Sequence, residues 1–222
     1  MIQVRDINKK YGANKVLRDI SFSVEDGTYV AIVGKNGGGK TTLMQILAGA
    51  LKPDTGELNY FGSFPLKQKG EFRKLTGYVP QKLPLIEELS VKDNLELWQV
   101  TPKLEKYEEV LEQFDLKDLL KKRVGTLSGG MQRRLSIACA AAHSPKLLLM
   151  DEPTSALDLS YKRKILEWME EYRTNGGIVL MTTHDEKEIM MCDRCIAIEN
   201  GTLTELPRKE LSIGEVLKII EK

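Results

Sequence analysis

Tyr29-Val30-Ala31-Ile32-Val33 runs directly into Gly34-Lys35-Asn36-Gly37-Gly38-Gly39-Lys40-Thr41, and this stretch decides the fold. The first five residues predict a β-strand. The segment that follows matches the pattern G-x-x-x-x-G-K-[ST] at every fixed position. Residues 41–49 predict a helix that ends at a glycine. A strand, a glycine-rich loop and a helix in this order predict a loop that wraps a chain of phosphates.

The residue types of this loop suit a triphosphate. Backbone N–H groups at a helix N-terminus bind anions, and glycines let the backbone approach them closely. We expect Lys40 to reach the β- and γ-phosphates, Thr41 to bind Mg²⁺ and Thr42 to hydrogen-bond a phosphate oxygen. The loop residues expected to bind nucleotide are Gly34, Lys35, Asn36, Gly37, Gly38, Gly39, Lys40, Thr41 and Thr42. The motif alone indicates a P-loop nucleotide-binding protein, a class that includes kinases, GTPases and ATPases. The alternative is a glycine-rich turn that binds nothing, and the flanking strand and helix argue against it.

The composition is that of an ordinary globular protein of 222 residues, which is enough for one large domain. Lysine and arginine number 33 and aspartate and glutamate 32, so the net charge is 33 − 32 = +1. This balance gives no electrostatic reason to expect nucleic acid as a partner. The densest basic run, residues 121–123, is better explained as a solvated helix end.

No stretch approaches the roughly 20 apolar residues that span a bilayer, and the N-terminus has no apolar signal core. We therefore expect a cytoplasmic chain, or one that lies peripherally on the cytoplasmic face of a membrane. Three cysteines do not form a disulfide framework. Cys192 and Cys195 spell C-x-x-C, but a zinc site needs a second ligand pair. A redox role stays open as the alternative to ordinary thiols at a helix-to-strand junction.

The pattern of apolar and turn residues predicts strands, then helices, then an α/β region. Ser90, with an acidic residue three positions later, predicts a helix N-cap. Strands are expected at residues 2–7, 20–24, 29–33, 58–61, 77–79, 146–150 and 178–181, with a hairpin of residues 196–199 and 202–205. Further helices are expected at residues 104–114, 131–142, 158–173 and 209–222.

Two carboxylates follow the apolar strand of residues 147–150. In a parallel α/β sheet, ligands bind outside the carboxyl ends of the strands. Asp151 is then expected to hold Mg²⁺, mostly through water, and Glu152 to orient or deprotonate the attacking water. The alternative is a strand that ends in solvated acids, and the sequence after Pro153 argues against it.

Leu127-Ser128-Gly129-Gly130-Met131-Gln132 resembles the signature motif of ATP-binding cassette (ABC) ATPases, which other P-loop families lack. Its neighbours match the same family in the family's order, from residue 11 to residue 184. Tyr11 resembles the aromatic residue that stacks on adenine, and Gln81 resembles the Q-loop glutamine. Residues 155–158 resemble the D-loop, and His184 resembles the switch histidine.

The resemblance implies an α/β P-loop NTPase fold with a mostly parallel sheet, an antiparallel β subdomain and a helical subdomain. One ABC ATPase domain would span residues 1–222. The core and β subdomain would take about 1–81 and 146–222, and the helical subdomain about 82–145.

The resemblance also implies a mechanism in which two such domains pack head to tail. Each ATP would lie between the phosphate loop of one domain and Ser128, Gly129 and Gly130 of the other, with Asp158 of the D-loop close by. The catalytic residues would be Glu152, His184, Gln81 and Lys40, and the Mg²⁺ ligands Thr41, Gln81 and Asp151.

Each of these residues also has an ordinary explanation. His184 could be a core or helix-capping histidine, Tyr11 a packed surface residue and Gln81 a loop amide, and only the full motif set favours the functional interpretation. His143 has no such context and is expected to be structural. Met131 stands where the family commonly has a polar residue, which puts a ribose contact in doubt.

We therefore expect the ATP-hydrolysing subunit of a membrane transporter that works with an integral membrane subunit. The residues after the signature glycines and the short C-terminal part favour an exporter. The alternatives are a single-cassette ATPase outside transport, such as an iron–sulfur assembly ATPase, and a module that binds ATP without hydrolysing it.

Overall fold

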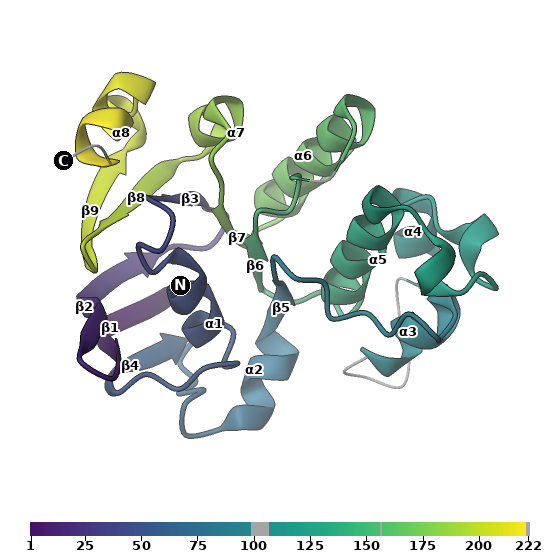
Figure 1. The fold of residues 1–222 in the computed structure, drawn as a ribbon, viewed down its shortest axis with the longest axis horizontal. Coiled ribbons are helices and arrows are strands. Elements are labelled where there is room, and N and C mark those ends of the chain that lie inside the picture. Colours follow the sequence, from purple (N-terminus) through teal and green to yellow (C-terminus); the bar gives the residue numbers. More distant parts are fainter. Residues whose placement is uncertain (99–106, 156, 221–222) are drawn as a thin grey trace.

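A computed structural model describes residues 1–98, 107–155 and 157–220. These residues form two sheets with helices around them (Figure 1). The larger sheet has the strand order β5-β6-β7-β3-β8-β9, in which only β9 is antiparallel to its neighbour. The smaller sheet, β2-β1-β4, is antiparallel. The predicted fold class, α/β with a mostly parallel sheet and an antiparallel β part, is confirmed.

The strands are β1 (Ile2–Tyr11), β2 (Asn14–Val24), β3 (Tyr29–Val33), β4 (Thr55–Tyr60), β5 (Thr76–Val79), β6 (Leu147–Asp151), β7 (Ile178–Thr182), β8 (Arg194–Glu199) and β9 (Thr202–Pro207). The helices are α1 (Lys40–Leu47), α2 (Lys69–Leu75), α3 (Val91–Leu97), α4 (Tyr107–Gln113), α5 (Gly129–Ala141), α6 (Leu159–Thr174), α7 (Glu186–Met191) and α8 (Ile213–Ile220).

Alternate residues of the parallel strands belong to two hydrophobic clusters, which lie on opposite faces of the sheet. Val30 and Ile32 of β3 pack with α1 and with the antiparallel sheet. Ala31 and Val33 face the other way, where residues of α5, α6, α7 and α8 complete the second cluster. A strand that is covered on both faces needs apolar residues at every position, so the continuous apolar runs in the sequence mark these buried strands.

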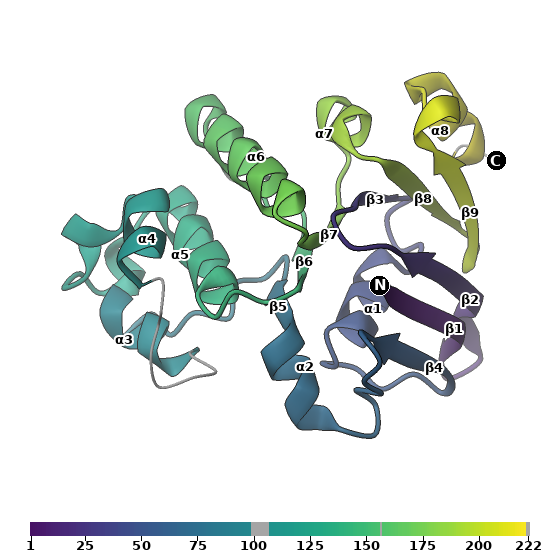
Figure 2. The same ribbon diagram turned by 180° about the vertical axis from the view of Figure 1, so that it is seen from behind.

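The helices α3, α4 and α5 lie together on one side of the molecule, beyond the β5 edge of the sheet (Figures 1 and 2). The predicted N-cap of α3 is confirmed, because Ser90 and Asp93 form a reciprocal capping box. None of the helices in the described ranges combines the length and the hydropathy that a membrane span requires.

Several predicted boundaries were wrong. The tail was expected to be helical from Lys209, but residues 208–210 form a short 3-10 turn and α8 begins only at Ile213. Strand β1 extends beyond the predicted residue 7 through register shifts that break the alternation of burial. Helices α2 and α7 were not predicted, because six or seven residues are too few to show a helical period. The predicted helix at 104–114 begins among residues outside the described ranges.

Candidate functional site

The glycine-rich loop lies at the carboxyl end of β3 and turns into α1. Gly34 and Gly39 have positive φ angles of 151° and 105°. A Cβ at Gly34 would stand 2.3 Å from the carbonyl oxygen of Ile198, and one at Gly39 would stand 3.0 Å from that of Val16. Both positions therefore need glycine for steric as well as conformational reasons. Between them, Lys35, Asn36 and Gly37 are exposed.

Lys40 is the first residue of α1 and is only 7% exposed. Its ammonium group donates hydrogen bonds to the carbonyl oxygens of Gly34 at 2.7 Å and Lys35 at 3.1 Å, so the chain curls around it. Burial lowers the pKa of Lys40, and the carboxylates of Glu152 and Asp151 act in the opposite direction. The next two side chains, Thr41 and Thr42, are more open to solvent.

Asp151 is the last residue of β6 and pairs in register with Thr182, the last residue of β7. Its side chain is 2% exposed, and Oδ1 accepts a hydrogen bond of 2.5 Å from the Thr182 hydroxyl. The other oxygen, Oδ2, is buried and has no hydrogen-bond partner among the described residues. A buried carboxylate oxygen without a protein donor is suited to a cation or its water shell.

Glu152 lies between the two other residues predicted to act with it. Its Oε2 accepts a hydrogen bond of 3.4 Å from Gln81 Nε2, and its Oε1 lies 3.4 Å from His184 Nε2. The backbone of Glu152 has a positive φ of 51°, and its N–H donates to the hydroxyl of Thr182 at 3.0 Å. The segments after β5, β6 and β7 thus bring Gln81, Glu152 and His184 together. Because His184 is 49% exposed and contacts Glu152, a core histidine is excluded.

Arg133 is a site residue that the sequence analysis missed. It lies on α5, is 4% exposed, and donates to the carbonyl oxygens of Pro80 and Gln81, both at 3.0 Å. Burial lowers the pKa of this guanidinium, and the charges of Asp151 and Glu152 partly compensate. Arg133 therefore connects the helix that carries the signature motif to the backbone of Gln81. Its signal in the sequence was the pair of adjacent charges, Arg133 and Arg134, that precedes the apolar, alanine-rich part of the helix.

The signature motif lies at the N-terminus of α5. Ser128 is the N-cap and accepts a hydrogen bond from the N–H of Met131 at 3.3 Å. Ser128 and Gly129 are exposed and Gly130 is half-buried. Within the described part of the chain, no hydrogen bond or ion pair joins these three residues to the glycine-rich loop. Met131 packs against the hydrophobic core, which explains why an apolar residue is accommodated there.

The remaining predicted site residues lie at the surface. Tyr11, at the end of β1, is 50% exposed, and Lys9 Nζ lies 5.8 Å from the centre of its ring. Asp158 is the N-cap of α6 and accepts hydrogen bonds from the N–H groups of Ser160 and Tyr161. Ala156 of the predicted D-loop lies outside the described residues.

Neither the cysteines nor His143 join this constellation. Cys192, at the end of α7, and Cys195, the second residue of β8, are buried free thiols, and burial raises their pKa values to about 11 and about 12. A raised pKa suppresses the reactive thiolate, which disfavours the redox alternative. His143 Nε2 lies 3.3 Å from the carbonyl oxygen of Thr76, and burial lowers the pKa of this imidazole.

A family model described as ABC transporter matches residues 17–155, more than half of the chain. The chain belongs to the ABC transporter family. The linearmycin resistance ATP-binding protein LnrL of Bacillus subtilis (strain 168) is similar to this ABC protein, with 33% identity over 216 residues. The match covers 94% of this chain and 70% of LnrL.

Solved structures of ABC cassettes have the same fold. A structure of the ATP-binding subunit of an ABC transporter matches with a TM-score of 0.91 and 27% identity over 100% of both chains. A dimeric post-hydrolysis state of an ATP-binding cassette, bound to ADP and Pi, matches with a TM-score of 0.85 and 27% identity. That match covers 94% of this chain and 99% of the other. This ABC protein is accordingly an ATPase, the ATP-driven subunit of a transporter.

Proposed function

We propose that this ABC subunit hydrolyses ATP with Glu152 as the residue that orients and deprotonates the attacking water. The observation that carries this proposal is the position of Glu152, with Gln81 Nε2 and His184 Nε2 each 3.4 Å from its carboxylate. Three groups that meet at the carboxyl end of a parallel sheet, next to a phosphate loop, form a suitable site for water-mediated phosphoryl transfer. His184 would contact the γ-phosphate in this arrangement, and Gln81 would lie close to the metal and the attacking water.

The phosphate loop and the two strand ends account for nucleotide and metal binding. Lys40 turns from its carbonyl partners to the β- and γ-phosphates, and Tyr11 offers an exposed ring for adenine. Mg²⁺ would be held by Thr41, Gln81 and Asp151, whose unpartnered Oδ2 fits that role. The ion would neutralise negative charge on the phosphates.

We also propose that two copies of the chain share each ATP head to tail. The helix α5 is 13 residues long and presents the exposed Ser128 and the glycine N–H groups at its N-terminus, where an anion is favoured. Leu159, which directly follows Asp158, is 87% exposed. An apolar side chain this open beside the D-loop suits a surface that a second subunit covers.

An integral membrane subunit is the proposed partner on another surface. A groove of about 700 Å³ lies between β5, α3 and α5, and its lining includes Tyr78, Leu85, Leu97 and Trp98. Leu97 and Trp98 are 54% and 42% exposed. A helix of the membrane subunit would dock there, close to Gln81, and would place this chain on the cytoplasmic face of the membrane. Residues 99–100, expected at the same surface, lie outside the described ranges.

In this proposal, residues 1–222 form one ATPase domain. The helical part, about residues 82–145, moves against the core and β parts, about residues 1–81 and 146–222. Arg133 and Gln81 lie at the connection between the two, so a movement of the docked membrane subunit reaches Glu152 through Gln81.

We propose export as the direction of transport, consistent with the resistance named for LnrL. An iron–sulfur assembly ATPase is the alternative. Purification from membranes separates the two, because a transporter subunit is recovered with a membrane protein and an assembly ATPase with soluble proteins. Replacing Trp98 by aspartate should abolish recovery of the membrane protein while the isolated chain keeps its ATP turnover.

The proposed role of Glu152 is tested by turnover of Glu152→Gln. A general base contributes about 10²–10⁴-fold to a rate, so kcat should fall by about that factor while ATP binding persists. Glu57→Gln is the control, because Glu57 lies at the surface, where it forms an ion pair with Lys67 at 3.5 Å. Wild-type turnover in Glu152→Gln would reject the role, and an inactive wild-type chain would support the non-hydrolysing alternative.

A further inference from the structure

Glu188 is a buried carboxylate that the proposed mechanism does not use. It lies on α7 and is 1% exposed. A charge removed from water must be paired and hydrogen-bonded, and both oxygens of Glu188 have partners. Oε1 accepts a hydrogen bond of 2.5 Å from the Thr154 hydroxyl and lies 2.8 Å from Lys162 Nζ. Oε2 accepts a hydrogen bond from the Thr183 hydroxyl.

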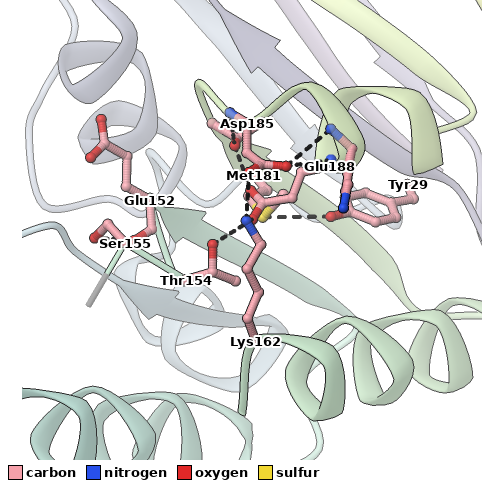
Figure 3. Close-up of polar contacts among 10 residues, drawn as sticks. Tyr29, Glu152, Thr154, Ser155, Lys162, Met181, Asp185 and Glu188 are labelled. Atoms are coloured by element: carbon pink, nitrogen blue, oxygen red, sulfur yellow. Dashed lines mark hydrogen bonds and ion pairs between the residues drawn. The ribbon is translucent and has the colours of Figure 1, made fainter. Parts of the chain in front are cut away.

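The two threonines belong to the two segments that carry the proposed catalytic side chains. Thr154 follows β6 and stands two residues after Glu152, while Thr183 follows β7 and directly precedes His184. Both threonines are buried, at 8% and 3% exposed. Figure 3 shows Glu188 among the dashed contacts, with Glu152 to one side of them. The Glu188 carboxylate therefore binds both segments, and among the described residues no hydrogen bond or ion pair joins it to the side chains of Glu152 or His184.

Lys162 of α6 supplies the positive charge that Glu188 needs. Its Nζ also lies 2.7 Å from Asp185 Oδ2, and the other oxygen of Asp185 accepts the N–H groups of Lys187 and Glu188 at the start of α7. Burial lowers the pKa of Lys162, but the hydrogen bonds that its ammonium group donates to Asp185 and Glu188 outweigh this effect and raise that pKa. The lysine therefore stays charged, and α6, which begins directly after the D-loop, is tied to α7.

We propose that Glu188 is a positioning residue for ATP hydrolysis, which sets the relative position of Glu152 and His184 by binding Thr154 and Thr183. This inference rests on the catalytic roles proposed above for Glu152 and His184. The hydroxyl of Thr182 already fixes the backbone N–H of Glu152. Glu188 in addition binds Thr154, two residues further along that segment, and Thr183, the residue before His184. It therefore limits how far the two segments move apart.

A positioning role and a purely structural role predict different kinetics. Misplacement of reacting groups by about 1 Å can cost up to about 100-fold in rate, while the groups proposed to bind ATP are the loop of residues 34–42, the ring of Tyr11 and the signature motif of a second copy. In the described part of the chain, no hydrogen bond or ion pair joins Glu188, Thr154 or Thr183 to that loop. Positioning therefore predicts a lower kcat with an unchanged KM for ATP. A structural role predicts a loss of folded protein and no change in kcat per folded molecule.

The most direct test compares Thr183→Ser with Thr183→Val in the full chain. Serine keeps the hydroxyl, which donates to Glu188 and accepts a hydrogen bond from the N–H of Asp185 at 3.0 Å, and valine replaces it with a methyl group. The same pair of variants at Thr154, whose hydroxyl donates to Glu188, tests the contact without the Asp185 hydrogen bond. We expect kcat within about twofold of wild type for Thr183→Ser and about tenfold lower for Thr183→Val. The KM for ATP should stay within about twofold in both. Equal kcat values for the serine and valine variants would overturn the proposal.

A double-mutant cycle with Glu188→Gln tests whether the two residues act through one contact. The glutamine amide cannot accept both hydroxyl hydrogen bonds, so we expect Glu188→Gln to lower kcat about tenfold as well. The kcat of the double variant should then be little lower than that of either single variant. Independent effects would multiply to a loss of about 100-fold in kcat, which would contradict the proposal. If Glu188→Gln fails to fold, the comparison of the serine and valine variants at Thr183 and at Thr154 still tests the positioning role.

Two controls separate this inference from the function on which it rests. Tyr60→Phe removes a buried hydrogen bond of 2.8 Å to the carbonyl oxygen of Leu47 on the other face of the sheet, and should leave kcat unchanged. Glu152→Gln should lower kcat by about 10²–10⁴-fold. Lost turnover in Glu152→Gln with wild-type kcat in Glu188→Gln and Thr183→Val would reject the positioning role alone. Retained turnover in Glu152→Gln would reject the catalytic role and the positioning role with it.

Discussion

Replacing Arg133 by methionine tests how the signature helix holds the Gln81 segment. The guanidinium donates to the carbonyl oxygens of Pro80 and Gln81, both at 3.0 Å, and is 4% exposed. Methionine fills much of the same space but donates nothing, so both carbonyls lose a charged donor.

The size of the effect follows from these two contacts. Hydrogen bonds with a charged partner contribute about 1.5–3 kcal/mol each, so the gross loss is about 3–6 kcal/mol. Relief of the buried guanidinium, whose pKa burial lowers, offsets part of it. We expect the free energy of unfolding to fall by about 2–4 kcal/mol. With a urea m-value of about 3 kcal/mol per M, the unfolding midpoint should fall by about 1 M.

Urea unfolding followed by the fluorescence of Trp98 and Trp168 measures this shift, and ATP turnover measures the consequence for Gln81. Arg134→Met is the matched control, because Arg134 is equally buried on α5 but bonds to Phe114 and Tyr161. Both variants should lose stability, and only Arg133→Met should lose turnover per folded molecule. An unchanged midpoint in Arg133→Met, or an equal loss of turnover in Arg134→Met, would refute the reasoning.

Two further predictions concern the phosphate loop and the loss of stability at low pH. Gly34→Ala places a methyl group 2.3 Å from the carbonyl oxygen of Ile198 at positive φ. It should cost about 2 kcal/mol or more and abolish ATP binding in calorimetry, while Gly70→Ala, which lies on α2 with open space around it and without a positive φ, should melt close to wild type. The hydrogen bond from Tyr161 holds the pKa of Asp115 below its ordinary value. That contribution is present above the pKa of the unfolded chain and is lost as the pH falls below about 4. Asp115→Asn should flatten the loss of stability in this range in urea titrations, and a steep loss of wild-type size would contradict the assignment.

Much of the fold could be predicted because its central strands are unambiguous. Tyr29–Val33 and Ile178–Thr182 are buried at every position, so burial on both faces leaves a continuous apolar run in the sequence. The start of α3 could also be predicted, because Ser90 and Asp93 form a capping pattern that is visible in the sequence. The 3-10 turn before α8 and the extension of β1 could not be predicted, because they depend on local backbone geometry and on pairing with β2.

The candidate site also has parts that could be predicted from the sequence and parts that could not. The glycine-rich loop and the acidic strand end carry their chemistry in the sequence, and the structure brings Gln81, Glu152 and His184 together as the resemblance implied. The partners that hold these residues could not be predicted. Glu188 stands in the run Asp185-Glu186-Lys187-Glu188, where nothing distinguishes a buried acid from exposed ones. Only the packing of α7 shows which carboxylate is inside.

The measurement that tests the central claim most directly is the oligomeric state of Glu152→Gln, by light scattering coupled to size exclusion. This variant should bind ATP without hydrolysing it. With ATP and Mg²⁺ we expect a shift from monomer to dimer, which is absent with ADP, because the γ-phosphate joins the loop of residues 34–41 to Ser128 of the second copy. A Glu152→Gln chain that binds ATP under the same conditions and stays monomeric would contradict the shared site.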